Sequence, residues 1–190
     1  MIPRWKLRQE FNRFGEQIRA LLSYPFEPLK KWKHDRDFPR SVRLTDGARS
    51  LGSKVAIYLI YQPRGILDST VLTCTHLTKQ GYSVMLVSNS KLAETDVERL
   101  IPQCWKIAER PNFGYDFGGY RDGIRLLREG RIAPKALVVL NDSIWWPIFT
   151  TDTILERMEA ADVDVVGTIM HHKPGRRNSG KSRRAFLESY

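Results

Sequence analysis

The chain has 190 residues, of which 42% are hydrophobic and 27% charged, which suits a soluble α/β domain with a sizeable core. The longest apolar run, residues 55–61, is too short to span a bilayer, and the charged N-terminus lacks the apolar run of a signal peptide. Only two cysteines are present, Cys74 and Cys104, which makes a disulfide framework implausible and favours a reducing compartment. We therefore expect a cytoplasmic protein.

The net charge of +10 is unevenly distributed along the chain. Residues 1–50 carry a net charge of +6, residues 51–170 carry −1, and residues 171–190 carry +5. Basic arms around a neutral domain favour contact with an anionic surface, either a membrane or a nucleic acid. No nucleic-acid motif is recognisable, so nucleic-acid binding is the less favoured of the two.

The first predicted element is an amphipathic helix over residues 7–22, in which apolar residues recur at helical spacing. Pro25 and Pro28 are expected to end it, and residues 29–50 are expected to form a polar connector. Residues 1–50 therefore form a basic amphipathic helix with its connector. Its apolar stripe suits three roles: packing on the domain, docking on an anionic membrane surface, or binding a partner helix.

From Lys54 onward, apolar strands and helices alternate. Strands are predicted at 55–61, 83–87, 105–108, 136–140 and 163–169, and helices at 68–80, 94–101, 117–129 and 153–159. This alternation predicts an α/β fold, a mostly parallel sheet with helices on both faces, over residues 51–170. Ligands of such sheets bind beyond the carboxyl ends of the strands, so the residues that follow each strand are the most informative.

The first unusual stretch, residues 110–123, follows the third predicted strand and enters a helix. Asp116 suits the N-cap of that helix. Gly118 and Gly119 would then lie in the first turn, where backbone N–H groups and the helix dipole attract an anion such as a diphosphate. Arg110 and Arg121 could add charge-assisted contacts. The alternative is a tight strand–helix joint, in which the small residues only permit close packing.

The second stretch, Leu140-Asn141-Asp142-Ser143, directly follows a predicted buried strand. Asp142 would present a carboxylate there, between the oxygen ligands of Asn141 and Ser143. Mg²⁺ or Mn²⁺ needs only one or two protein carboxylates when phosphate oxygens and water complete its shell. The alternative is a cap on the turn into the next helix. Trp145 and Trp146 follow, either as walls for a sugar or base or as a cover over the sheet end.

The order of these motifs resembles the rhamnan synthesis protein F family over roughly residues 54–170. These residues are Arg110, Asn112, the string Gly114-Tyr115-Asp116-Phe117-Gly118-Gly119-Tyr120-Arg121-Asp122-Gly123, and then Leu140 to Ser143. The resemblance implies a bacterial rhamnosyltransferase of cell-surface polysaccharide or O-antigen assembly. More loosely, the layout is similar to the Rossmann-like donor-binding half of GT-A glycosyltransferases.

The resemblance also implies a set of ligands and a set of binding residues. The donor would be a nucleotide sugar such as dTDP-rhamnose, and the acceptor a lipid-linked sugar or polysaccharide. Because lipid-linked acceptors lie at the membrane, we favour the membrane role for the N-terminal helix. Asp142 would take the metal or diphosphate role. The expected nucleotide-sugar-binding residues are Arg110, Asn112, Gly114, Asp116, Gly118, Gly119, Arg121, Asn141, Asp142 and Ser143.

The sequence departs from this pattern in two places. Asn141-Asp142-Ser143 stands where metal-dependent GT-A enzymes have Asp-x-Asp, which leaves one carboxylate and opens the question of metal dependence. The basic tail 171–190 looks like an element cut short, and the catalytic base is unassigned. His171 and His172 are candidates by position, although a solvated pair is the commoner outcome, and His76 is expected to be structural. The alternative function is a non-catalytic nucleotide-sugar-binding module, a fragment or a partner subunit.

Overall fold

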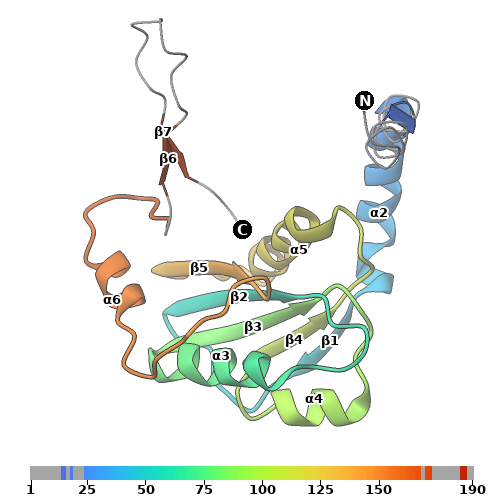
Figure 1. Ribbon diagram of the computed structural model, residues 1–190. Helices are drawn as coiled ribbons and strands as arrows, with labels where there is room; N and C mark the ends of the chain where they lie inside the picture. Colours follow the sequence, from blue (N-terminus) through green and yellow to red (C-terminus); the bar gives the residue numbers. More distant parts are fainter. Residues whose placement is uncertain (1–13, 16–17, 19–23, 168–169, 173–184, 188–190) are drawn as a thin grey trace, which may run out of the picture. The chain divides into compact units, whose positions relative to one another are not determined.

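The computed structural model describes residues 14–15, 18, 24–167, 170–172 and 185–187 (Figure 1). The chain divides into two compact units, Met1–Ser41 and Val42–Tyr190. Each unit is described by itself below.

The first unit contains a short 3-10 helix, η1 (Tyr24–Phe26), followed by the helix α2 (Glu27–Ser41). The helix predicted over 7–22 lies mostly outside the described residues. The predicted connector 29–50 is wrong, because α2 occupies its first half. Pro28 lies in the first turn of α2, where a missing N–H costs nothing, so it begins a helix rather than ending one. Lysine and arginine are good helix formers, so a strongly charged segment can be helical. The connector was predicted from the polarity of the segment alone, and that is why α2 was missed.

The second unit is built on a five-stranded sheet. Its strands are β1 (Arg43–Asp46), β2 (Lys54–Ile60), β3 (Tyr82–Ser88), β4 (Lys106–Glu109) and β5 (Ala136–Asn141). Their order is β1-β4-β3-β2-β5, and all pairs are parallel except β1 with β4. The predicted mostly parallel α/β sheet is therefore confirmed. The edge strand β1 was not predicted, and it comes from the second half of the expected connector.

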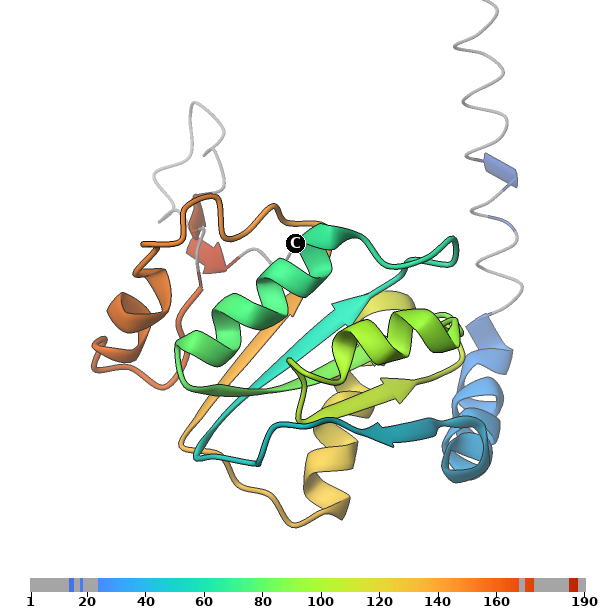
Figure 2. The ribbon, with the colours of Figure 1, turned by 90° about the horizontal axis from the view of Figure 1, so that it is seen from below.

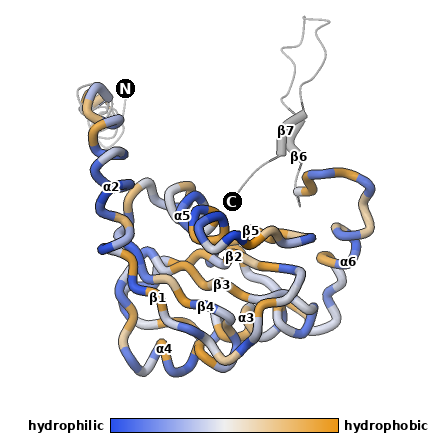
Figure 3. The backbone as a smooth tube through the Cα atoms, turned by 180° about the vertical axis from the view of Figure 1, so that it is seen from behind, coloured by the Kyte–Doolittle hydropathy of each residue, from blue (hydrophilic) through white to orange (hydrophobic). Residues whose placement is uncertain are grey.

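Helices cover both faces of this sheet. The helices α3 (Asp68–Lys79) and α4 (Glu94–Leu100) lie on one face, and α5 (Tyr115–Glu129) lies on the other (Figure 2). The short α6 (Ile154–Glu159) packs its Leu155 into the core on the α3 face. A second core joins Leu127 of α5 to Ile57 and Leu59 of β2. Figure 3 shows hydrophobic residues running along the central strands, as burial on both faces requires.

The strand predicted at 163–169 does not join the sheet. Residues 163–167 are exposed and irregular, and residues 168–169 lie outside the described residues. The next strand, β6 (Met170–His172), pairs with β7 (Ala185–Leu187) in a separate two-stranded antiparallel sheet. The error has a physical cause: valine content reports a preference for extended backbone, while pairing depends on an available partner strand.

The strand order creates a switch point between β2 and β5. The chain moves outward from β2 through β3 to β4 and then returns to the other side of β2 as β5. In open α/β sheets, ligands bind at the carboxyl ends of the strands where the direction of winding reverses. Within the described part of the chain, no helix is long and apolar enough to cross a membrane.

Candidate functional site

Polar side chains gather at the carboxyl edge of the four parallel strands. Gln62 follows β2, Asn89 follows β3, Arg110 follows β4, and Asn141 ends β5. All four are buried. Because buried polar groups must find partners, the contacts of these residues determine the architecture of the edge.

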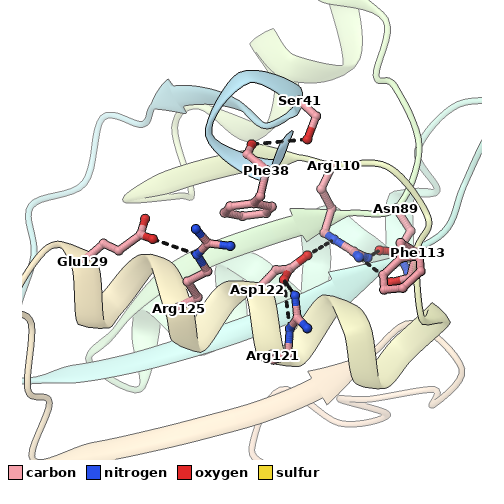
Figure 4. Close-up of polar contacts among 9 residues, drawn as sticks. All are labelled: Phe38, Ser41, Asn89, Arg110, Phe113, Arg121, Asp122, Arg125 and Glu129. Carbon is pink, nitrogen blue, oxygen red and sulfur yellow. Dashed lines mark hydrogen bonds and ion pairs between the residues drawn. The ribbon is translucent and has the colours of Figure 1, made fainter. Parts of the chain in front are cut away.

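Arg110 is the centre of one group of polar contacts at this edge, and its side chain is shielded from solvent. We call Asn89, Arg110, Phe113 and Asp122 the closed cluster (Figure 4). Arg110 Nε donates to Asp122 Oδ2 at 2.7 Å, and both side chains are only 1% exposed. The other two guanidinium nitrogens donate to Asn89 Oδ1 and to the carbonyl oxygen of Phe113. Burial lowers the pKa of the Arg110 guanidinium, and the Asp122 carboxylate opposes that effect.

The closed cluster gives Arg110 a structural role. Each of its three guanidinium nitrogens has a partner inside the protein, so it ties the loop after β4 to β3 and to α5. Arg121, the second predicted arginine, is partly exposed and donates through Nε and Nη2 to the other oxygen of Asp122. A contact between either arginine and a diphosphate stays a prediction.

The start of α5 differs from the prediction in its cap. Gly114, not Asp116, is the N-cap, and it adopts a left-handed conformation with φ of 72°. Glycine takes this conformation at little cost, and no side chain caps the helix. Asp116 lies within the first turn instead. Asn112, another predicted binding residue, is exposed on the preceding loop.

With the cap at Gly114, Gly118 and Gly119 are the fourth and fifth residues of α5, and both have packing roles. A Cβ on Gly118 would lie 2.0 Å from the Phe113 carbonyl oxygen, and one on Gly119 would lie 2.3 Å from Leu59 Cδ1. The tight joint between strand and helix is therefore present at both positions. Their predicted approach to an anion is a separate property and stays a prediction.

The second group of polar residues is open to solvent in part. We call Asp116, Tyr120, Asn141 and Asp142 the open cluster. Asn141 Nδ2 donates to Asp116 Oδ2 at 2.9 Å, which links the end of β5 to α5. Burial, followed by the charges of Asp116 and Asp142, raises the pKa of Tyr120 to about 12. Both carboxylates thus act on one phenol at the carboxyl edge of the sheet.

Asp142 lies at the switch point itself. Its Oδ2 accepts hydrogen bonds from the Tyr61 backbone N–H and from Gln62 Nε2, both at 3.0 Å. Gln62 is held in turn by Thr70 on α3. The carboxylate therefore bridges the ends of β2 and β5 while remaining partly exposed. Ser143, which follows, is exposed.

The two predicted aromatic residues separate into different environments. Trp145 is exposed, whereas Trp146 is half-buried with its ring against His76 at a centroid distance of 4.8 Å. Thr73 on α3 also donates to the Trp146 carbonyl oxygen at 2.6 Å. Trp146 thus covers the sheet end, and the buried position of His76 agrees with its expected structural role. His171 and His172 lie in β6, and their side chains are outside the described residues.

The oxygen atoms of the open cluster suit a hard divalent cation. Within the described residues, no hydrogen bond occupies Asp142 Oδ1, and Asn141 Oδ1 is buried without a hydrogen-bond partner. Carboxylate and amide oxygens are ligands that Mg²⁺ and Mn²⁺ accept. The same residues include no group of three or more His, Cys, Asp or Glu side chains that could hold a metal. A metal at this point would need phosphate oxygens and water to complete its shell, and it stays a prediction.

Four members of these clusters were not predicted to belong to the site: Asn89, Phe113, Tyr120 and Asp122. Gln62, the hydrogen-bond partner of Asp142, was not predicted either. Gln62 and Asn89 follow predicted strands. The rule that ligands bind beyond the carboxyl ends of strands, called the strand-end rule below, could therefore have identified them. Tyr120 and Asp122 lie within the string that carries the family resemblance, but their roles depend on which side of α5 faces the sheet.

The fold defines an α/β protein with a mostly parallel sheet, and its polar residues gather at the carboxyl edge, which contains the switch point. The family model for rhamnan synthesis protein F matches residues 84–190, more than half of the chain, and the chain belongs to this family. It is also 42% identical over 173 residues to the uncharacterized protein y4gN of Sinorhizobium fredii. That alignment covers 91% of this chain and 45% of the relative, so the chain spans less than half of the relative's length. No solved structure matches the chain.

Proposed function

We propose that the chain is the donor-binding half of a GT-A-like glycosyltransferase. The reaction is transfer of a sugar, rhamnose in the first instance, from a nucleotide-activated donor during bacterial cell-surface polysaccharide or O-antigen synthesis. Membership in the rhamnan synthesis family supports the pathway. The observation that carries the proposal is Asp142, a partly exposed carboxylate at the switch point, with Asp116 nearby in the open cluster.

In the proposed reaction, an acceptor hydroxyl attacks the anomeric carbon of the donor. The bond from that carbon to the diphosphate oxygen breaks, and the diphosphate leaves with the electron pair through an oxocarbenium-like transition state. The protein must position both partners and stabilise the departing charge. The N-terminal turn of α5 supplies backbone dipoles for that purpose. Mg²⁺ or Mn²⁺ held by Asp142 would neutralise diphosphate charge.

The other proposed contacts surround this point. Asn112 and Gly114 lie on the loop before α5, and Ser143 is exposed in the turn that follows β5. The proposed acceptor is a lipid-linked sugar or a polysaccharide. The basic helix predicted over 7–22 would contact the inner face of the plasma membrane, where such acceptors lie. The base that accepts the hydroxyl proton is not assigned to any described residue.

A non-catalytic nucleotide-sugar-binding module is the second candidate. The observation in its favour is that the matched region covers only 45% of the longer relative, so a complete reaction centre can require more than the matched region. Both candidates need donor binding at the open cluster, and only the first needs turnover.

Calorimetry with dTDP-rhamnose and other nucleotide sugars, with and without Mg²⁺ or Mn²⁺, tests donor binding. We expect Asp142→Asn to weaken binding by about 10- to 100-fold, because one charge-assisted contact is lost. The asparagine oxygen can still accept from Tyr61 and Gln62, so the fold should persist. Asp46→Asn is the matched control, since Asp46 pairs with Lys106 where β4 begins, at the opposite edge of the sheet.

The outcomes separate the candidates. Loss of binding in Asp142→Asn with sugar release by the wild type supports the transferase, and binding without turnover supports the module. Wild-type affinity in Asp142→Asn would refute the role of this carboxylate. If no nucleotide sugar binds, both candidates are wrong.

A further inference from the structure

The exposed face of α2 combines apolar and basic side chains. Leu29, Trp32, Lys33, Arg36 and Arg40 follow the spacing i, i+3, i+4, i+7 and i+11, which places them on one side of a helix. Leu29 is 61% exposed and Trp32 is 56% exposed. Tyr24 and Phe26 of η1, directly before α2, are exposed as well. Large apolar side chains left in solvent along one stripe mark a contact surface.

The charges of α2 are segregated around this stripe. Glu27 and Asp35 lie on other sides of the helix, and Asp37 lies at the margin, where it accepts from Arg36 Nε at 2.9 Å. The Arg36 guanidinium also lies over the Trp32 ring, 4.8 Å from its centroid. The stripe is therefore basic and aromatic, and it has no acidic residue in its centre. Figure 3 shows the resulting alternation of hydrophilic and hydrophobic residues along α2.

We propose that this face of α2 docks on an anionic lipid surface, with the helix lying in the plane of the membrane. Tryptophan prefers the boundary between head groups and acyl chains, where its ring is buried and its N–H stays hydrated. Lysine and arginine beside it reach the head-group phosphates while their stems cover apolar surface.

Charge favours lipid over a second copy of this chain. Two copies that met through this stripe would bring Lys33, Arg36 and Arg40 of each toward the same cations of the other. Like charges held close in this way repel. At an anionic membrane, each basic residue near the surface instead strengthens binding roughly fivefold. This inference is independent of the donor site, because it concerns only residues of the first unit.

The sharpest test compares two charge reversals on the same helix. Lys33→Glu lies on the stripe, whereas Lys31→Glu is two residues away, is exposed and lies off it. Both variants have the same net charge, and any contribution from residues 1–22 is the same in both. The full chain is sedimented with phosphatidylcholine vesicles that contain or lack phosphatidylglycerol. We expect Lys33→Glu to lower partitioning onto the anionic vesicles about 30-fold, and Lys31→Glu to lower it much less.

Trp32 provides a second measurement. Brominated acyl chains should quench wild-type fluorescence, and the quenching should fall in Trp32→Phe, which keeps an apolar ring. Circular dichroism confirms that each variant stays folded. Equal losses for Lys33→Glu and Lys31→Glu, or equal wild-type binding to neutral and anionic vesicles, would overturn the proposal. So would a change in oligomeric state in Lys33→Glu, which would assign the stripe to a protein interface. Nucleotide-sugar binding should be unchanged in these variants.

Discussion

The closed and open clusters lie along the same sheet edge, and both contain charged residues, yet they differ in what their charges contact. In the closed cluster, Arg110 and Asp122 satisfy one another and are shielded from water. In the open cluster, Asp142 keeps one oxygen outside the hydrogen bonds of the described residues and remains partly exposed. A charged residue at a strand end can act as a ligand only when the fold leaves part of its bonding capacity unused. The closed cluster holds the edge together, and the open cluster contains the residues of the proposed donor site.

The largest effect should come from breaking the closed cluster. Asp122→Asn removes the charge opposite Arg110 and leaves a buried guanidinium without a counterion. We expect the free energy of unfolding to fall by about 3–5 kcal/mol, measured by urea denaturation.

Glu129→Gln is the control for that variant, because it makes the same chemical change on the same helix. Its pair with Arg125 lies at the surface, with the Glu129 side chain 53% exposed and the Arg125 side chain 27% exposed. The expected loss is about 0.3–0.5 kcal/mol. Similar losses in Asp122→Asn and Glu129→Gln would contradict the shielded character of the closed cluster.

A smaller effect is expected where α5 packs on the sheet between the two clusters. Gly119→Ala should lower the free energy of unfolding by about 1–3 kcal/mol, because its Cβ would overlap Leu59. Helix propensity alone predicts the opposite sign. The double variant with Leu59→Ala should lose less than the sum of the single variants. Additive losses would show that the contact is not the cause.

The smallest effect concerns protonation in the open cluster. The pKa of Tyr120 is raised from 10.0 to about 12, so the folded state favours the neutral phenol. The unfolded chain therefore ionises first as pH rises, and stability contributed by this group is lost between pH 10 and about 12. Tyr120→Phe should remove this contribution to the loss of stability at high pH. Ultraviolet titration of the wild type against this variant reports the pKa, and an ordinary value would show that burial and the two carboxylates do not raise it.

Much of the fold was predictable because its strands are continuous apolar runs. Buried parallel strands such as β2 and β3 need hydrophobic residues on both faces, and turn residues bound them. The strand-end rule then indicated where Asp142 would lie. The edge strand β1 was missed because half-exposed antiparallel edges carry no such run. The valine-rich run at 163–169 was misassigned, because composition does not show whether a partner strand is available.

The site was less predictable than the fold. The sequence shows that Arg110 follows a strand. It does not show that Asp122, on the following helix α5, would form an ion pair with Arg110. The same limit applies to Asp116, which suits an N-cap by type but instead accepts a hydrogen bond from Asn141 at the end of β5. Side-chain partners from separate elements depend on tertiary packing, and local patterns do not encode them.

The position of β5 beside β2 also has a consequence for the order of folding. The hydrogen bond from the Tyr61 N–H to Asp142 joins residues 81 positions apart, whereas β2 and β3 are connected by a single helix. Contacts between distant residues form slowly, because closing a long loop costs entropy before it gains any interaction. We therefore expect the β2–β3–β4 core to assemble first, and the carboxylate of Asp142 to reach its place only in the last steps.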